Sequence, residues 1–325
     1  MSSISKATKK VNSFLLAGLD RNPRELYKAA SHLIEYGGKR LRPYMVIKSC
    51  EVLGGTVKQA MPAAAAVEMI HNFTLVHDDI MDNDDMRHGV PTVHTKFGMP
   101  VGILAGDVLF SKAFETISSR NYQTPKEVRL ALVSNLARAC VDVCEGQMLD
   151  IMMAQSNETP SESQYITMIE KKTAALFEVS CSMGAICANT KRKDVVNLSL
   201  FGKNLGIAFQ IVDDLIGVIG DSRLTKKPVG NDIREGKKSL PILLAISKST
   251  GQKRETIINA FGNSMASKDE IEVAAKIIAS LGIEKIVKKK AMKYSSTARK
   301  ALSPYNGAAK KELLSLLEFV VKRSL

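Results

Sequence analysis

The chain has 325 residues, 45% of them hydrophobic, which is enough for a sizeable core and too many for a disordered chain. Its 46 Lys and Arg exceed its 33 Asp and Glu, for a net charge of +13, but the basic runs 191–193 and 288–290 contain no aromatic residues, which argues against nucleic-acid binding. The first residues form no apolar signal segment, and no uninterrupted apolar run approaches the roughly 18 residues of a membrane span. We therefore expect a soluble cytoplasmic protein without a membrane span.

Helical periodicity dominates the chain. Segment 23–38 has apolar residues at helical spacing and ends in two glycines, a common stop signal for helices. Pro43 can open a second helix over 43–55, because proline is favoured in the first helical turn. The alanine-rich segment 60–82 predicts a third helix.

Turn-forming residues mark three loops between the helical segments. Glycines and prolines predict a loop over 89–100, and the polar segments 155–164 and 221–239 predict two more. The sequence contains no convincing β-alternation and no linker that would divide it. We therefore predict one all-α domain over residues 1–325, a bundle of about ten or more helices.

Negative charge concentrates in one short stretch, HDDIMDNDDMRHGVPTVH, although the chain as a whole is basic. On a helix, Asp78 and Asp82 are neighbours one turn apart, with Asp79 beside them. Carboxylates this close repel one another unless a cation lies between them, and Mg²⁺ prefers such oxygen ligands. The alternative is a solvated acidic helix end, which is the interpretation we adopt for Asp84 and Asp85.

A second acidic motif, FQIVDDLIGVIGD, favours metal binding. It places Asp213 and Asp214 inside an otherwise apolar helix, where burying a carboxylate without a partner is costly. Two such clusters on separate helices can hold metal between them. Basic residues recur near both motifs, and Arg and Lys bind phosphate oxygens, so the sequence predicts a diphosphate substrate. The basic residues are Lys39, Arg40, Arg42, Arg87, Lys172, Lys227 and Lys237.

These motifs resemble those of trans-type isoprenyl diphosphate synthases, the polyprenyl synthetase family. The segments GGKRLRP, DDIMD with RHGVPTVH, GQMLD, KTAALF, FQIVDDL and KPVGNDIREGKKSLP follow one another in the family's order over residues 37–241, about two thirds of the chain. One DDxxD motif alone is weak evidence, whereas the whole series is specific. The resemblance implies an isoprenoid synthase-like bundle around a central apolar pocket, a homodimer and a Mg²⁺-dependent prenyltransferase.

The resemblance also implies the reaction: isopentenyl diphosphate condenses with an allylic diphosphate to give a short-chain all-trans prenyl diphosphate. Asp78 and Asp82 are expected to bind Mg²⁺ from one helix and Asp213 from the opposite helix, with Asp79 and Asp214 supporting them. The metal neutralises the charge that develops on the departing diphosphate. No nucleophilic side chain is needed.

Two substrate sites follow from the same resemblance. Beside the reacting carbon we expect Thr173 and Gln210, whose oxygens can stabilise an allylic cation electrostatically. Gln147 and Asp150 are expected to support the metals. The residues expected to bind the allylic diphosphate are Arg87, Lys172, Thr173, Gln210, Lys227 and Lys237, and those expected to bind isopentenyl diphosphate are Lys39, Arg42, His71 and His88, while Arg40 is assigned to the surface.

His71 has an alternative role, because a histidine on an apolar helix is more often a hydrogen-bonded core residue. It precedes Asp78 by seven residues, which places both side chains on one helix face and favours a substrate contact.

Two positions depart from the family pattern. The family usually carries two Arg before GxP, where this chain has Arg87 and His88; histidine lacks the guanidinium fork and can be neutral near pH 7. This substitution affects the isopentenyl diphosphate site. The second acidic motif has Gly217 where many members carry a third Asp, and Asp221 is a candidate substitute.

The product length is expected to depend on Phe73 and Thr74, which stand five and four residues before Asp78. An aromatic residue followed by a small one resembles enzymes that make geranylgeranyl diphosphate (C20) more than those that stop at farnesyl diphosphate (C15). On a helical wheel, however, Thr74 shares the face of Asp78 and Phe73 points away from it. An ordinary core position is therefore the alternative for Phe73.

Three other functions stay open. The same chemistry can stop at farnesyl diphosphate. A terpene cyclase also ionises a prenyl diphosphate, but it has no need of a second diphosphate site such as GGKRLRP. A non-catalytic partner subunit is disfavoured by the intact aspartates in both acidic motifs.

Overall fold

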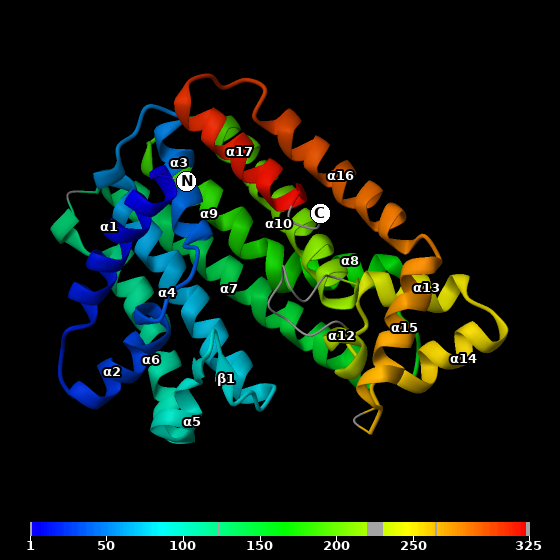
Figure 1. Ribbon diagram of the computed structural model, residues 1–325. Helices are drawn as coiled ribbons and strands as arrows, with labels where there is room; N and C mark the ends of the chain where they lie inside the picture. The colour runs from blue at the N-terminus through cyan, green and yellow to red at the C-terminus, as the bar shows by residue number, and fades with distance from the viewer. Residues whose placement is uncertain (1, 123, 220–229, 264, 323–325) are drawn as a thin grey trace. The chain divides into compact units, whose positions relative to one another are not determined.

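The computed structural model describes residues 2–122, 124–219, 230–263 and 265–322, most of them helical (Figure 1). The predictions of an all-α fold and of ten or more helices are confirmed. The first half of the chain forms α1 (Ser2–Leu19), α2 (Arg24–Glu35), α3 (Leu41–Glu51), α4 (Val57–Met81), β1 (Met86–Arg87), β2 (Val90–Pro91), α5 (Val93–Phe97), α6 (Met99–Ser118), the short 3₁₀ turn η1 (Arg120–Tyr122) and α7 (Lys126–Gln155). The second half forms α8 (Glu162–Ile169), the π-helical turn η2 (Glu170–Ala174), α9 (Ala175–Cys187), α10 (Arg192–Ile219), α12 (Asn231–Arg234), α13 (Leu240–Lys248), α14 (Gly251–Ala260), α15 (Lys268–Ser280), α16 (Ile283–Ala301) and α17 (Ala308–Lys322).

The chain divides into two compact units. The first comprises Met1–Cys140, Val179–Ser199 and Tyr305–Leu313, and the second comprises Val141–Glu178, Leu200–Pro304 and Leu314–Leu325. Each unit is described by itself below. The single domain over residues 1–325 stays a prediction.

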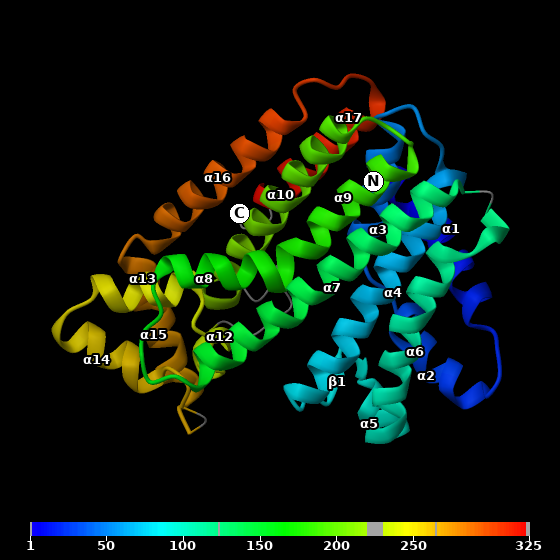
Figure 2. The same cartoon turned by 180° about the vertical axis from the view of Figure 1, so that it is seen from behind.

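In the first unit, α4 packs along α6 and α3, as both views of the ribbon show (Figures 1 and 2). Ala60 and the run 63–66 of α4 are fully buried. Such small side chains let neighbouring helices approach closely while still removing apolar surface from water. Helix α4 begins with a capping box, in which Thr56 and the side chain of Gln59 satisfy each other's backbone N–H groups.

In the second unit, the core lies among α8, the later part of α10, α13, α15 and α16. Its fully buried side chains include Tyr165 of α8, Ile211 and Val218 of α10, Ile242 of α13 and Val287 of α16. Capping boxes start α8 and α15 as well, so polar signals in the sequence fix where these helices begin.

The predicted helices occur with shifted ends. The helix predicted over 23–38 is α2, and that predicted over 60–82 is α4. The helix predicted to open at Pro43 begins at Leu41, which leaves the proline inside the first turn, where its missing N–H costs nothing.

The predicted loops hold only in part. Of the loop predicted over 155–164, residues 156–161 form a loop between α7 and α8, and the ends of the predicted range belong to those helices. Within the loop predicted over 89–100, the chain forms the short helix α5. Of the loop predicted over 221–239, residues 221–229 lie outside the described residues, and α12 forms a helical turn in the remainder. Gly and Pro signals mark chain reversals but cannot exclude single helical turns between them.

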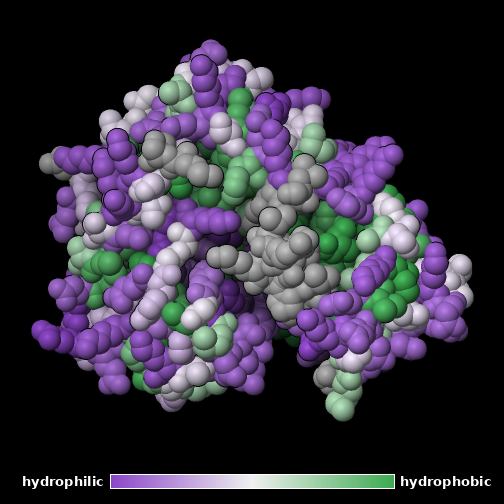
Figure 3. Space-filling model, in the orientation of Figure 1, coloured by the Kyte–Doolittle hydropathy of each residue, from purple (hydrophilic) through white to green (hydrophobic). Residues whose placement is uncertain are grey.

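Judged by length and hydropathy alone, one helix of the described residues, α10, could cross a membrane. Its apolar stretch is 56% buried in the protein, and a core helix passes the same test. The surface seen in the orientation of Figure 1 is largely hydrophilic, with scattered hydrophobic patches (Figure 3).

Candidate functional site

Helix α4 ends inside the first acidic motif with a Schellman arrangement. The N–H of Asn83 donates to the carbonyl of Ile80 at 3.4 Å, and the N–H of Asp84 donates to the carbonyl of Asp79 at 2.9 Å. Asn83 has a φ of 55°, a left-handed conformation that asparagine tolerates better than most residues. The chain therefore reverses immediately after Asp82.

The hairpin of β1 and β2 returns Arg87 to the helix. Its two loop residues, His88 and Gly89, have φ values of 52° and 81°, as a type I′ turn requires. The reversal lets the Nε–H of Arg87 donate to Oδ1 of Asp79. His88 is exposed at the hairpin tip.

Asp79 is fully buried, with 0% exposure. Burial raises its pKa, and the neighbouring guanidinium of Arg87 opposes that rise. Its second oxygen, Oδ2, is buried without a hydrogen-bond partner. Leaving a buried acceptor unsatisfied costs about 1–3 kcal/mol, so this oxygen is suited to a further donor or cation.

Asp78 is half-buried and Asp82 is exposed, both at the C-terminal turn of α4. The negative end of the helix dipole strengthens the attraction of this turn for a cation. Within the described residues, no three His, Cys, Asp or Glu side chains form a complete metal-binding group. Mg²⁺ needs only one or two carboxylates, because water and substrate phosphates complete its shell, so this oxygen set fits it.

Arg42 and His71 form one hydrogen-bonded pair in the first unit. Arg42 Nη1 lies 3.1 Å from His71 Nε2, and because a guanidinium can only donate, Nε2 accepts and the imidazole is neutral. Burial, and then the charge of Arg42, hold the pKa of His71 well below its usual range. Lys39 is exposed on the preceding loop. His71 is thus hydrogen-bonded to a predicted substrate-binding residue.

The assignment of Arg40 to the surface is wrong. Its side chain is 3% exposed and forms an ion pair with Glu68 at 2.8 Å. The guanidinium also donates to Asn12 Oδ1 at 2.8 Å and to the carbonyl of Ile34 at 2.6 Å. A buried ion pair with additional hydrogen bonds is costly to break from one side, which gives Arg40 a structural role. The two residues before it, Gly38 and Lys39, are exposed, and no pattern in the sequence distinguishes Arg40 from the other basic residues of GGKRLRP.

Phe73 lies at the seam between α4 and α6. Its ring packs edge-on against His77, with centroids 4.6 Å apart, and against Phe110 of α6, 5.2 Å apart. Phe114 continues the row beyond Phe110 at 5.1 Å. The hydroxyl of Thr74 donates to the carbonyl of His71 at 2.8 Å and so is satisfied by its own helix. The sequence analysis missed Phe110 and Phe114, although their four-residue spacing is a helical signal.

Asp214 organises the second acidic motif. Its side chain is 1% exposed. Oδ2 accepts a hydrogen bond from the hydroxyl of Tyr165 at 2.7 Å. Oδ1 accepts from Gln210 Nε2 at 2.7 Å and from Lys237 Nζ at 2.9 Å. The buried carboxylate therefore fixes three side chains, of which only Tyr165 escaped the sequence analysis, because a lone buried tyrosine carries no motif.

The charges in this network depend on one another. Burial disfavours the cationic form of Lys237, but Asp214 and Asp232 more than offset it and raise the pKa of Lys237. Burial and the same two carboxylates hold the pKa of Tyr165 well above its usual range. Lys237 is therefore cationic and Tyr165 a hydrogen-bond donor at neutral pH. Asp213, next to Asp214 on α10, is half-buried.

The π-helical turn η2 carries Lys172 and Thr173. Lys172 forms an ion pair with Asp150 of α7, so Asp150, expected to support the metals, contacts this lysine. The hydroxyl of Thr173 donates to Gln210 Oε1 at 2.9 Å. Since Gln210 in turn donates to Asp214, its amide has a fixed orientation.

The turn η2 packs against α7 without room for a side chain. A Cβ atom on Gly146 would lie 2.1 Å from the backbone nitrogen of Lys172. On the other side, a Cβ atom on Gly206 of α10 would lie 2.7 Å from Cα of Ala174. Both glycines thus permit backbone contact, and π-turns often occur at functional sites. The motif GQMLD contains Gly146, but the sequence analysis gave it no role.

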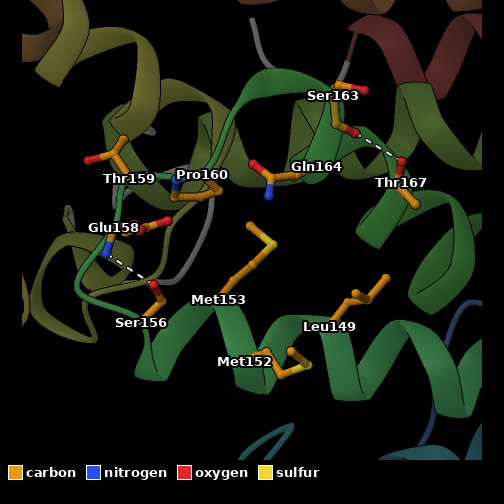
Figure 4. A pocket seen from close by; sticks show the side chains of 10 residues that line it. All are labelled: Leu149, Met152, Met153, Ser156, Glu158, Thr159, Pro160, Ser163, Gln164 and Thr167. Carbon is orange, nitrogen blue, oxygen red and sulfur yellow. Dashed lines mark hydrogen bonds between the residues drawn. The ribbon is translucent and has the colours of Figure 1, made fainter.

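A pocket of about 330 Å³ lies between α7 and α8 in the second unit (Figure 4). Leu149, Met152 and Met153 of α7 line one side, and Gln164 and Thr167 of α8 line the other. It contains none of the predicted site residues. Lys227 and Asp221 lie outside the described residues.

The family model that matches this chain is described as polyprenyl synthetase and covers residues 23–278. The chain is 39% identical over 316 residues to the geranylgeranyl diphosphate synthase of Sulfolobus acidocaldarius, covering 96% of this chain and 95% of that protein. It is 42% identical over 270 residues to a short chain isoprenyl diphosphate synthase of Methanocaldococcus jannaschii, covering 83% of this chain and 80% of that protein.

A solved structure extends the likeness to the fold. The crystal structure of geranylgeranyl pyrophosphate synthetase from Pyrococcus horikoshii superposes with a TM-score of 0.91 at 35% identity, covering 99% of this chain and 98% of that one. The match in sequence and the match in fold both extend over nearly the whole chain. The chain therefore belongs to the polyprenyl synthetase family and is a prenyltransferase of that family.

Proposed function

We propose that the protein condenses isopentenyl diphosphate with allylic diphosphates in a Mg²⁺-dependent reaction and releases geranylgeranyl diphosphate. The observation that carries this proposal is the fixed set of cations and hydrogen-bonding groups around Asp79 and Asp214. Each buried carboxylate holds a basic side chain, Arg87 or Lys237, in a defined position. We further propose that the enzyme acts as a cytoplasmic homodimer.

Asp78, Asp82 and Asp213 are the proposed metal ligands. Magnesium held there supplies a Lewis acid that neutralises the charge of the leaving diphosphate. Arg87, Lys172 and, from outside the described residues, Lys227 complete the proposed allylic diphosphate site together with Lys237. Arg forks onto two phosphate oxygens, while each Lys acts as a point charge.

Thr173 stabilises the allylic cation in this proposal. Its hydroxyl proton is committed to Gln210, so the oxygen lone pairs are left to face positive charge. Gln210 cannot rotate freely, because its amide also donates to Asp214. Preorganised dipoles of this kind lose little energy to reorientation during the reaction.

Lys39, Arg42 and His88 are proposed to bind isopentenyl diphosphate, and His71 to orient Arg42. The neutral imidazole of His71 accepts from Arg42 Nη1 and so restricts the orientation of the guanidinium that we propose contacts a phosphate group. The double bond of isopentenyl diphosphate then attacks the cation left when the allylic diphosphate departs, and loss of a proton to the released diphosphate regenerates a double bond. No nucleophilic side chain is needed.

The proposed product is the C20 diphosphate. Its support is twofold: the row of Phe73, Phe110 and Phe114, which we assign as the floor for the growing chain, and the geranylgeranyl diphosphate synthases among the relatives. Geranylfarnesyl synthases also occur among the relatives, so a longer product is the alternative with a specific observation behind it.

The test is to incubate the protein with isopentenyl diphosphate, Mg²⁺ and each allylic primer in turn, and to separate the dephosphorylated products by chain length. We expect a C20 product, and a loss of several kcal/mol of transition-state stabilisation in the Asp78→Ala variant. Turnover near wild type in that variant at saturating Mg²⁺ contradicts the metal assignment. Cyclic products, or no product with any primer, contradict the proposed function itself.

A further inference from the structure

Gly217 and Asp232 meet so closely in the second unit that no side chain fits at position 217. A Cβ atom on Gly217 would lie 2.5 Å from both carboxylate oxygens of Asp232. Gly217 belongs to α10 and Asp232 to α12, and both residues are buried. The carboxylate of Asp232 therefore fills the space into which a side chain at position 217 would project.

Asp232 shares a cation with the second acidic motif. Its Oδ2 lies 3.9 Å from Lys237 Nζ, while the same ammonium donates to Asp214 Oδ1 at 2.9 Å. Asp214 already accepts from Tyr165 and Gln210. The ammonium of Lys237 therefore interacts with two carboxylates, those of Asp214 and Asp232. Of these, Asp214 also binds Tyr165 and Gln210.

We propose that Asp232 is a positioning residue that supplies the third carboxylate of the second acidic cluster, in the space left open by Gly217, and fixes Lys237 together with Asp214. The proposal rests on the proposed function, in which Lys237 binds the allylic diphosphate. Asp232 acts through the lysine, whose ammonium it holds in place. Asp232 thus replaces the third aspartate of the second acidic motif, a role for which the sequence had suggested Asp221.

Removing only the charge tests this role. Asp232→Asn keeps the shape of the side chain, so the packing against Gly217 is retained while the attraction to Lys237 is lost. We expect the KM for the allylic substrate to rise about tenfold, equivalent to about 1.4 kcal/mol, with the KM for isopentenyl diphosphate and the unfolding temperature nearly unchanged. The matched control is Asp269→Asn, an exposed aspartate in the first turn of α15.

Moving the carboxylate tests the geometry. Gly217→Ala improves helix propensity but pushes the carboxylate of Asp232 aside, so allylic KM should rise although α10 gains intrinsic stability. The double variant Gly217→Asp with Asp232→Gly returns one carboxylate to the cluster from α10. The double variant should have a lower KM for the allylic substrate than Asp232→Gly alone. Two independent sites would instead give additive effects, so this recovery would show that positions 217 and 232 are coupled.

A binding measurement separates this proposal from the proposed function. Calorimetric titration with inorganic diphosphate and Mg²⁺ needs no turnover, and Asp232→Asn should bind about tenfold more weakly than wild type. Equal binding and equal allylic KM in the two proteins overturn the role of Asp232, even if wild type is an active prenyltransferase. Absence of prenyltransferase activity in wild type, with the binding difference present, overturns the proposed function alone.

Discussion

Gly146 should be indispensable for activity because it sets the position of η2. A methyl group there would lie 2.1 Å from the backbone nitrogen of Lys172, and 2.6 Å from both the carbonyl carbon of Lys171 and Cα of Lys172, whereas ordinary contact begins at 3.4 Å. The Gly146→Ala variant must therefore separate α7 from η2 by roughly 1.3 Å. Lys171 resists this movement, because its ammonium is paired with Asp142 and Glu145, both in the turn of α7 that precedes the glycine.

The displacement carries Lys172 and Thr173 away from their working positions. A misplacement of about 1 Å can cost on the order of a hundredfold in rate, equivalent to about 2.7 kcal/mol. We expect kcat/KM for the allylic substrate to fall by about that factor, with the KM for isopentenyl diphosphate little changed. Overpacking should cost about 1–3 kcal/mol of unfolding free energy.

The assay is incorporation of labelled isopentenyl diphosphate at varied allylic substrate, beside a urea unfolding curve for each protein. The matched control is Gly18→Ala in α1, where a Cβ atom meets nothing within 4 Å, and it should behave as wild type. A Gly146→Ala enzyme within threefold of wild-type kcat/KM would refute the argument. A variant that loses stability in proportion to activity, without a change specific to the allylic substrate, would limit Gly146 to a packing role.

Three further predictions concern the first unit. Lowering the pH through about 6.5 should tighten isopentenyl diphosphate binding if His88 contacts it, since imidazole gains a proton there; the idea fails if wild type and His88→Arg have the same pH dependence of KM. Phe73→Ser should lengthen the products, as chromatography of the dephosphorylated mixture can test, whereas unchanged lengths in a folded, active variant leave Phe73 as core. Because the pKa of His71 is depressed in the folded protein, its contribution to stability is present above about pH 6.5 and is lost as the pH falls; in His71→Gln, urea unfolding curves should show a weaker loss of stability on acidification than wild type.

Motif residues could be predicted from sequence because their chemistry is local. Burying adjacent aspartates in an apolar segment, as at Asp213 and Asp214, is costly unless a partner offsets it. Of the partners of Asp214, Gln210 stands in the same motif and Lys237 in the next. The helical fold was equally accessible, since apolar periodicity and caps are local signals. The two-residue strands were missed because hairpins this short carry no alternation.

The remaining site residues could not be predicted because their roles arise from tertiary contact. Arg40 resembles Lys39 in sequence, yet burial beside Glu68 gives it a different role. Tyr165 and Asp232 reach the second acidic cluster from other elements, which no spacing along the chain foretells. The need for glycine at position 146 depends on how closely the backbone of η2 approaches α7, and this distance is known only from the structure.

In both acidic motifs, the two aspartates of the Asp-Asp pair differ in burial and in role. In each pair the first aspartate, Asp78 or Asp213, is half-buried, while the second, Asp79 or Asp214, is at most 1% exposed and binds a basic side chain. Successive residues of a helix point about 100° apart, so a pair at the edge of a buried face sends one carboxylate inward and leaves the other accessible. The inward carboxylate alone would be costly, and the cation that offsets this cost, Arg87 or Lys237, is thereby fixed beside its accessible neighbour. An Asp-Asp pair thus places a candidate metal ligand and a candidate phosphate-binding cation together, which neither aspartate could achieve singly.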